Sequence, residues 1–200
     1  MKNTIKVSCF ALALVLGFST VACSGSASGG KTFNSAEELK AYLDKQPAKG
    51  PDNPIKVTMA ANAPMLEKIA ATINSAGKYV SLSFSGSALT NIPASAFYKC
   101  DSLVAINIPD SVTSIGQDAF GKCTSLISLN IPNGIKSIGI RAFWDCPSLT
   151  SVKFECTLAI NPGLNPFYPS GDLLAKYLEG GIGTYTTKNP GRNDSVWTKQ

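Results

Sequence analysis

The chain has 200 residues, of which 44% are hydrophobic and only 16% charged, and its formal net charge is +5. It contains no histidine, which excludes Ser-His-Asp and Cys-His nucleophilic systems and zinc sites built on histidine. The basic residues form no run and only two of them are arginine, which argues against nucleic-acid binding.

Residues 1–22 are typical of a bacterial lipoprotein signal. Lys2 and Lys6 precede the apolar run "VSCFALALVLGFSTVA", which is too short to span a bilayer comfortably and ends before Cys23. We expect cleavage there and lipid attachment to Cys23; the alternative is an ordinary signal peptide with an incidental cysteine. Residues 23–32, rich in Gly and Ser, predict a flexible tether. This anchor would place the protein in the cell envelope, at the outer membrane or cell surface.

Residues 33–79 predict a helical N-terminal capping region. Ser35 and Glu38 have capping-box spacing at the start of the helix "NSAEELKAYLDK". A strand "PIKVTM" and a second helix ending at Gly77 follow, and then the strand "YVSLSF". Val57 and Leu82 stand 25 residues apart, which indicates a longer first coil whose return arm is a full helix.

Residues 80–156 contain internal repeats. Two 23-residue units begin at Ala105 and Ser128, an upstream unit begins at Ser81 with one extra residue, and a fourth begins at Ser151 and then departs from the pattern. The repeat predicts a solenoid, because units that bury little alone share a continuous core when stacked. The columns expected in that core include Phe97, Phe120 and Phe143; Cys100, Cys123 and Cys146; and Leu103, Leu126 and Leu149.

Each unit predicts a short strand, a turn and a tight return segment. Ile106 and Ile108 alternate with small residues, as in a strand with one buried face. Pro109 closes the strand, Gly116 marks a turn, and the spacing of three between Phe, Cys and Leu suits a 3₁₀ or short helical return.

The cysteine column raises three possibilities, namely metal, disulfides or a structural core. A Cys₄ zinc site needs pairs spaced two to four residues apart, which this spacing lacks. Adjacent coils lie within reach of a disulfide, but three equivalent cysteines cannot all pair. Cys156 is out of register, because the column would continue at Pro169. We therefore predict reduced, buried thiols that act as small hydrophobic groups.

Residues 157–200 predict a C-terminal cap. The segment "SGDLLAKYLEGG" is typical of a helix stopped by paired glycines, and "GTYTT" and "SVWTK" could form a closing hairpin.

The run "IPDSVTSIGQDAFGKCTSL" resembles the repeat of BspA-type (treponemal) leucine-rich-repeat proteins. The likeness covers residues 80–155, and the leader and the tail "KYLEGGIGTYT" are similar to short treponemal members. It implies an α/β leucine-rich-repeat solenoid of parallel strands, right-handed and displayed outside the cell. It also implies adhesion to host matrix proteins such as fibronectin and fibrinogen, or contact between bacteria.

Strand alternation predicts an outward-facing surface that could bind a partner. Its candidate residues are Ser81, Ser83, Ala105, Asn107, Ser128, Asn130, Ser151 and Lys153. The alternative is a merely solvated strand face. Tyr98 and Trp144 are candidate aromatic anchors, although they could equally cover the rim of the core.

Two functions follow from these patterns. The first is a lipid-anchored, cell-surface module that binds host or bacterial proteins; the second is an envelope or periplasmic scaffold with no host ligand. We predict no enzymatic activity, no metal and no cofactor.

Overall fold

The computed structural model describes residues 31–200, apart from 87, 159 and 161–163. The signal segment and Cys23 lie outside the described residues. Within these residues, no helix is long and apolar enough to cross a membrane.

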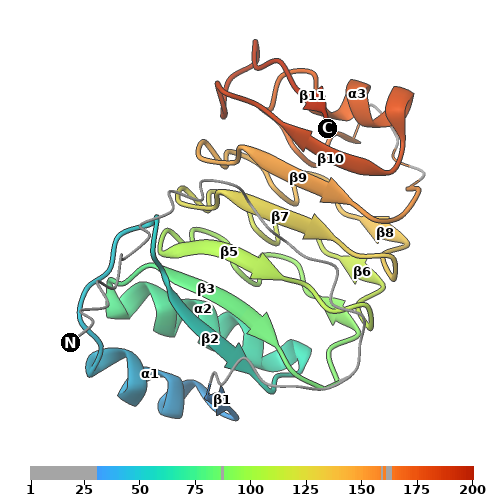
Figure 1. The fold of residues 1–200 in the computed structure, drawn as a ribbon. Coiled ribbons are helices and arrows are strands. Elements are labelled where there is room, and N and C mark those ends of the chain that lie inside the picture. Colours follow the sequence, from blue (N-terminus) through green and yellow to red (C-terminus); the bar gives the residue numbers. More distant parts are fainter. Residues whose placement is uncertain (1–30, 87, 159, 161–163) are drawn as a thin grey trace, which may run out of the picture.

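The architecture is a stack of coils with a helical cap at each end (Figure 1). An eight-stranded sheet forms one side, in the order β1-β2-β3-β5-β7-β9-β10-β11. A second, three-stranded sheet has the order β4-β6-β8. The parallel arrangement confirms the predicted α/β leucine-rich-repeat solenoid. The large sheet consists of β1 (Thr32–Phe33), β2 (Ile55–Met59), β3 (Val80–Phe84), β5 (Leu103–Asn107), β7 (Ser128–Ile131), β9 (Ser151–Phe154), β10 (Gly183–Thr186) and β11 (Thr198–Lys199). The small sheet consists of β4 (Asn91–Ile92), β6 (Ser114–Ile115) and β8 (Ser137–Ile138).

The N-terminal cap contains α1 (Ala36–Asp44), a short 3₁₀ turn η1 (Ala63–Met65) and α2 (Leu66–Ala76). Ser35 caps α1, since its Oγ accepts a hydrogen bond from the Glu38 amide at 3.1 Å. Glu38 reaches back to the Asn34 amide at 3.0 Å. Strands β2 and β3 pair in parallel with Val57 opposite Leu82, so β2, α2 and β3 form the predicted longer coil.

The predicted tether over residues 23–32 includes one residue that belongs to the fold. Thr32 is part of β1 and pairs with Thr58 of β2. The adjacent Phe33 is buried in the core. Burial of its apolar side chain stabilises β1 against β2, because apolar surface is removed from water.

The phenylalanine column is the centre of the core and extends farther than its sequence pattern indicated. The rings of Phe97, Phe120 and Phe143 stack with centroids 5.2 Å apart and planes within 5° of parallel. Phe167 continues the column at 5.2 Å from Phe143. The Phe143 amide also donates to the Pro166 carbonyl at 2.7 Å. The Phe120 amide donates in the same way to the Ala142 carbonyl of the following coil, also at 2.7 Å.

This fourth coil corrects the prediction that the repeats end at residue 156. Phe167 stands 24 residues after Phe143, so one extra residue hides the repeat from a strict 23-residue period. In the first three coils the cysteine stands three residues after the phenylalanine. In the fourth coil this position is the buried Ser170, whereas the strict 23-residue period predicted Pro169.

Two positions in each of three coils adopt left-handed backbone angles without being glycine. Their φ values lie between 52° and 60°. These positions recur at intervals of 23 residues, on either side of the phenylalanine. They are Ser95, Asp118 and Arg141 in one column, and Lys99, Lys122 and Asp145 in the other.

The C-terminal cap contains α3 (Leu173–Gly180) and the hairpin of β10 and β11, and both were predicted. Strand β10 runs antiparallel to β9, with Tyr185 opposite Val152. Trp197 is buried and donates from Nε1 to the Ser170 carbonyl at 2.7 Å. Tyr177 of α3 stacks on Phe154 at 4.0 Å, so the cap covers the last coil with aromatic rings.

Candidate binding surface

The outward residues of the central strands form two straight rows across the large sheet. Strand register aligns Ser81, Ala105, Ser128 and Ser151 in one row. It aligns Ser83, Asn107, Asn130 and Lys153 in the other. These eight residues are called the sheet face below.

The sheet face is polar and almost uncharged. Asn107 is exposed and the other members are half-buried, while alternate residues such as Leu82, Ile106 and Leu129 lie in the core. Its one charged member, Lys153, forms an ion pair with Glu155 at 2.6 Å. The face therefore offers hydroxyl and amide groups to a partner, with its charge neutralised at the C-terminal end.

Both caps extend these rows, which the sequence analysis missed. In β2, Lys56 pairs with Ser81 and Thr58 pairs with Ser83. In β10, Thr184 pairs with Lys153 and Thr186 with Ser151. The 25-residue spacing between Val57 and Leu82 could have revealed the β2 positions, because it fixes the register of the flanking outward residues.

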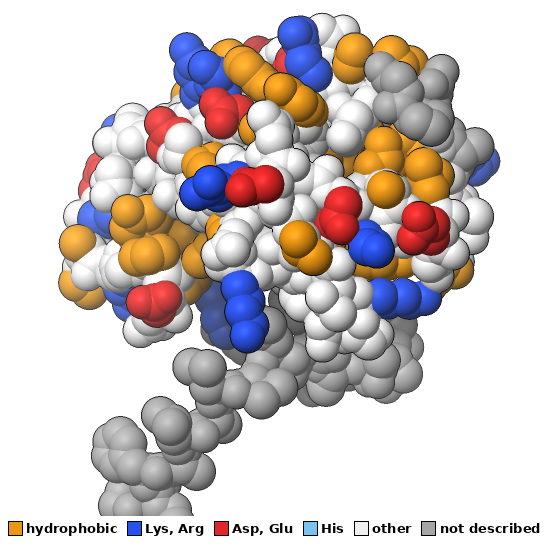
Figure 2. Space-filling model, turned by 90° about the horizontal axis from the view of Figure 1, so that it is seen from above, with side chains coloured by type: hydrophobic (Ala, Val, Ile, Leu, Met, Phe, Trp, Pro, Cys, Tyr) orange, Lys and Arg blue, Asp and Glu red, His pale blue; other side chains and the backbone are white. Residues whose placement is uncertain are grey.

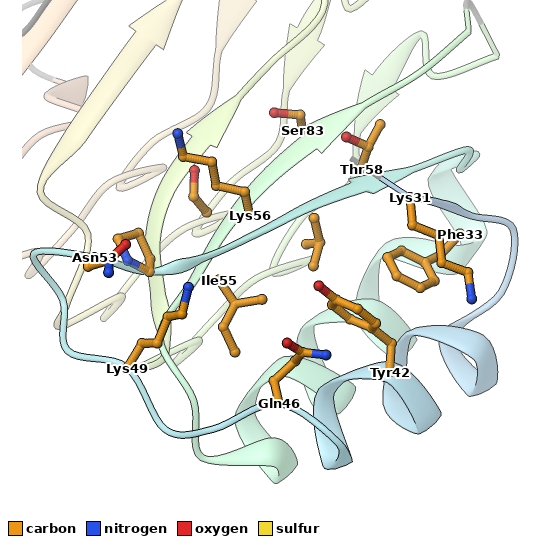
Figure 3. Close-up of a pocket in the computed structure, with 13 residues that line it drawn as sticks. Lys31, Phe33, Tyr42, Gln46, Lys49, Asn53, Ile55, Lys56, Thr58 and Ser83 are labelled. Carbon is orange, nitrogen blue, oxygen red and sulfur yellow. The ribbon is translucent and has the colours of Figure 1, made fainter. Parts of the chain in front are cut away.

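A groove of about 580 Å³ lies at the N-terminal end of the sheet face (Figure 3). It is bounded by β2, by the side of α1 that carries Tyr42, and by the loop that joins α1 to β2. Ser81 and Ser83 line both the groove and the sheet face, so the two surfaces are continuous. The half-buried Tyr42 ring supplies its aromatic wall and packs on the buried Phe33, with ring centroids 4.9 Å apart. The sequence patterns did not single out this groove.

The candidate aromatic anchors Tyr98 and Trp144 lie on return segments, not on strands, and line a smaller pocket of about 310 Å³. Tyr98 is 37% exposed, while Trp144 is half-buried beneath Lys122, whose Nζ lies 4.8 Å from the ring. The Tyr98 ring leans over Gly121, where a Cβ atom would lie 3.1 Å from it. Arg141 beside them holds Asp118 through two contacts of 3.0 Å. These rings therefore already have intramolecular contacts.

The cysteine column lies in the core. Cys100, Cys123 and Cys146 are buried, and the latter two donate weak hydrogen bonds to the carbonyls of Phe97 and Phe120, at 3.1 and 3.2 Å. Burial raises the pKa of Cys100 and of Cys146 to about 12. No group of His, Cys, Asp and Glu residues in the described part of the chain is arranged to hold a metal ion.

Comparisons with known proteins find leucine-rich repeats. The model of the BspA type leucine rich repeat region matches residues 73–168 in six copies. No curated protein sequence matches the chain. The crystal structure of a leucine-rich-repeat protein of T. pallidum aligns at 32% identity, covering 49% of this chain and 44% of that one, with a TM-score of 0.38. A leucine-rich-repeat protein from Bacteroides ovatus aligns at 29% identity, covering 52% of this chain and 26% of that one, with a TM-score of 0.40.

The chain thus spans less than half the length of either solved protein. Leucine-rich repeats generally serve as protein-binding scaffolds, and residues 73–168 of this chain match the model of the BspA type leucine rich repeat region.

Proposed function

We propose that the protein is a lipid-anchored module of the cell surface that binds protein partners through its sheet face. The observation that carries the proposal is the sheet face itself, two aligned rows of mostly hydroxyl and amide side chains on parallel strands. Such groups can hydrogen-bond to the backbone and side chains of a partner without the desolvation penalty of buried charges.

The proposed lipid anchor lies in the residues that precede the solenoid in the chain. Cys23 follows an apolar leader and precedes the Gly/Ser-rich segment, so a lipid on Cys23 would hold the solenoid near a membrane. The partners would be host matrix proteins, such as fibronectin and fibrinogen, or proteins on other bacteria. This placement follows the resemblance to BspA-type proteins.

Binding is tested with the full chain in mild detergent, against immobilised matrix proteins and intact bacterial cells. We expect the double variant Asn107→Arg and Asn130→Arg to lose binding, because two large cations would stand in one row of the sheet face. The matched control is Asn189→Arg with Asn193→Arg, which adds the same charge at exposed positions of the C-terminal loop. Uniform absence of binding, or equal loss in both variants, would overturn the proposal.

Location is tested separately by treating intact cells with protease and by fractionating cells that carry Cys23→Ala. A surface lipoprotein is digested on intact cells, and the Cys23 variant leaves the membrane fraction. A protein that stays protected until the envelope is opened would instead support the envelope scaffold with no host ligand.

A further inference from the structure

The groove at the N-terminal end of the sheet face is lined by several positively charged side chains. Three lysines line it, namely Lys31, Lys49 and Lys56, and all three are exposed. They come from three different segments, which are the residue before β1, the loop after α1, and β2. Figure 3 shows Lys49 and Lys56 on one side of the Tyr42 ring and Lys31 on the other.

In the part of the chain that the structure describes, no acidic residue lines the groove and none forms an ion pair with these three lysines. Nearby lysines are engaged in a different way. Lys40 pairs with Asp44 at 2.8 Å, Lys68 pairs with Glu37, and Lys78 donates to backbone carbonyls that include Gln46 at 2.6 Å. The positive charge of the groove is therefore left for a ligand.

The rest of the binding surface has no such imbalance. At the opposite end of the sheet face, Glu155 neutralises Lys153. Figure 2, which views the molecule from above onto its C-terminal end, shows basic and acidic side chains interspersed there. The net positive charge is therefore concentrated at the N-terminal end of the sheet face, in the groove. The middle of the face carries hydroxyl and amide groups, and the charge at its C-terminal end is neutralised by an ion pair.

We infer that the groove receives an acidic, extended segment of the protein partner, with its carboxylates between Lys31, Lys49 and Lys56. This inference rests on the proposed function, because the same partner would continue across Ser81 and Ser83 onto the sheet face. The partly exposed Tyr42 ring would contact the apolar parts of that segment, and the amides of Gln46 and Asn53 lie in the same groove to pair with its backbone. The concave, partly aromatic lining favours a chain segment over a flat membrane surface.

The test uses the full chain in mild detergent and a fluorescent peptide of alternating Glu and Ser, with a Gln-and-Ser peptide as the neutral probe. The variant is Lys49→Gln with Lys56→Gln. The matched control is Lys136→Gln with Lys188→Gln, which removes the same charge from exposed lysines outside the groove. Vesicles of phosphatidylcholine with and without phosphatidylglycerol form the membrane arm.

We expect the acidic peptide to bind, the neutral peptide to bind weakly, and the groove variant to lose about three- to tenfold in affinity while the control is unchanged. The inference is overturned by equal loss in both variants, by binding that ignores the lysines, or by lysine-dependent binding to anionic vesicles without peptide binding. If Asn107→Arg with Asn130→Arg leaves protein binding intact, the proposed sheet-face function fails while the peptide result still decides the groove.

Discussion

The thiol of Cys123 lies 3.1 Å from the carbonyl oxygen of Phe97 in the preceding coil, and it donates a weak hydrogen bond to that oxygen. Cys146 repeats this contact with Phe120 at 3.2 Å. The column thus links successive coils through neutral, buried thiols. A thiolate there would lose its hydration and repel the carbonyl oxygen, and this loss of hydration raises the pKa of each buried thiol.

Stability is therefore expected to fall in alkaline solution. The pKa of Cys100 and Cys146 is about 12 in the folded chain against an ordinary 9.0, and that of Cys123 is also raised. Between these values the unfolded chain has lost protons that the folded chain retains, so the free energy of unfolding decreases as pH rises. The decrease is up to about 1.4 kcal/mol per pH unit for each thiol. Urea unfolding across this range measures it, and Cys123→Ala is expected to flatten the slope. A slope that this variant leaves unchanged would contradict the assignment.

The same burial predicts slow thiol chemistry in the native chain. At neutral pH, the three column cysteines are expected to resist an alkylating reagent when folded and to react fully in urea, because neither the thiolate nor the reagent has access to the core. Mass spectrometry of the labelled peptides reports each cysteine. Fewer free thiols than cysteines after unfolding, in the absence of reductant, would mean disulfides in place of a reduced column.

The phenylalanine column predicts a large loss of stability on truncation. Phe120 is completely buried between two stacked rings, so Phe120→Ala removes both contacts and leaves a cavity. We expect the free energy of unfolding to fall by about 3–5 kcal/mol. Val196→Ala, at a 67% exposed position, is the control and is expected to change it by less than about 0.5 kcal/mol. Denaturant unfolding by circular dichroism measures both, and similar losses would contradict the packing.

Glycine at the coil turn is required by close approach and not by a positive φ. A Cβ at Gly139 would lie 2.5 Å from the Gln117 amide nitrogen of the preceding coil. Gly139→Ala therefore has to push two coils apart, at a cost of about 1–3 kcal/mol or more. Gly50 has no atom within 4 Å of its Cβ position, so Gly50→Ala is expected to stabilise the chain by about 0.4–1 kcal/mol. In thermal unfolding, the midpoint temperature is expected to fall for Gly139→Ala and to rise for Gly50→Ala. Shifts in the same direction would contradict the explanation by close approach.

The left-handed positions predict that some substitutions by glycine stabilise the fold. Ser95 has φ 58°, which strains a residue with a Cβ, whereas Ser137 lies in extended strand β8 and is likewise exposed. Ser95→Gly is expected to raise the free energy of unfolding by about 0.5–1 kcal/mol and Ser137→Gly to lower it by a similar amount. Ser95→Val should lower it by about 1–2 kcal/mol. Denaturant midpoints of the three variants decide, and a loss in Ser95→Gly would contradict the strain.

Much of the fold follows from periodicity along the sequence. The 23-residue spacing places like residues in like positions, so the strands, the phenylalanine column and their parallel order could be predicted from the spacing alone. The capping of α1 by Ser35 was predictable because it depends on residues only three apart. Phe167 was missed because one inserted residue shifts it, while stacking on Phe143 still restores its place in three dimensions.

The basic groove could not be predicted in this way. Lys31, Lys49 and Lys56 stand in three segments, and each alone resembles an ordinary surface lysine. Only the pairing of β1 with β2 and the packing of α1 beside them bring the three together. The sheet face remains a prediction as a binding site, since strand register fixes where its residues stand but not what they contact.

The reversed direction of β10 determines how this protein could grow. A further parallel coil has no parallel strand to join beyond β9, because the closing hairpin occupies that edge. Length can instead be added between the caps, by duplication of an internal 23-residue unit such as the one that begins at Ser128. Each duplication would widen the sheet face by one strand and leave the basic groove untouched. The binding surface could thus widen by one strand at a time to fit a larger partner, while the basic groove stays the same.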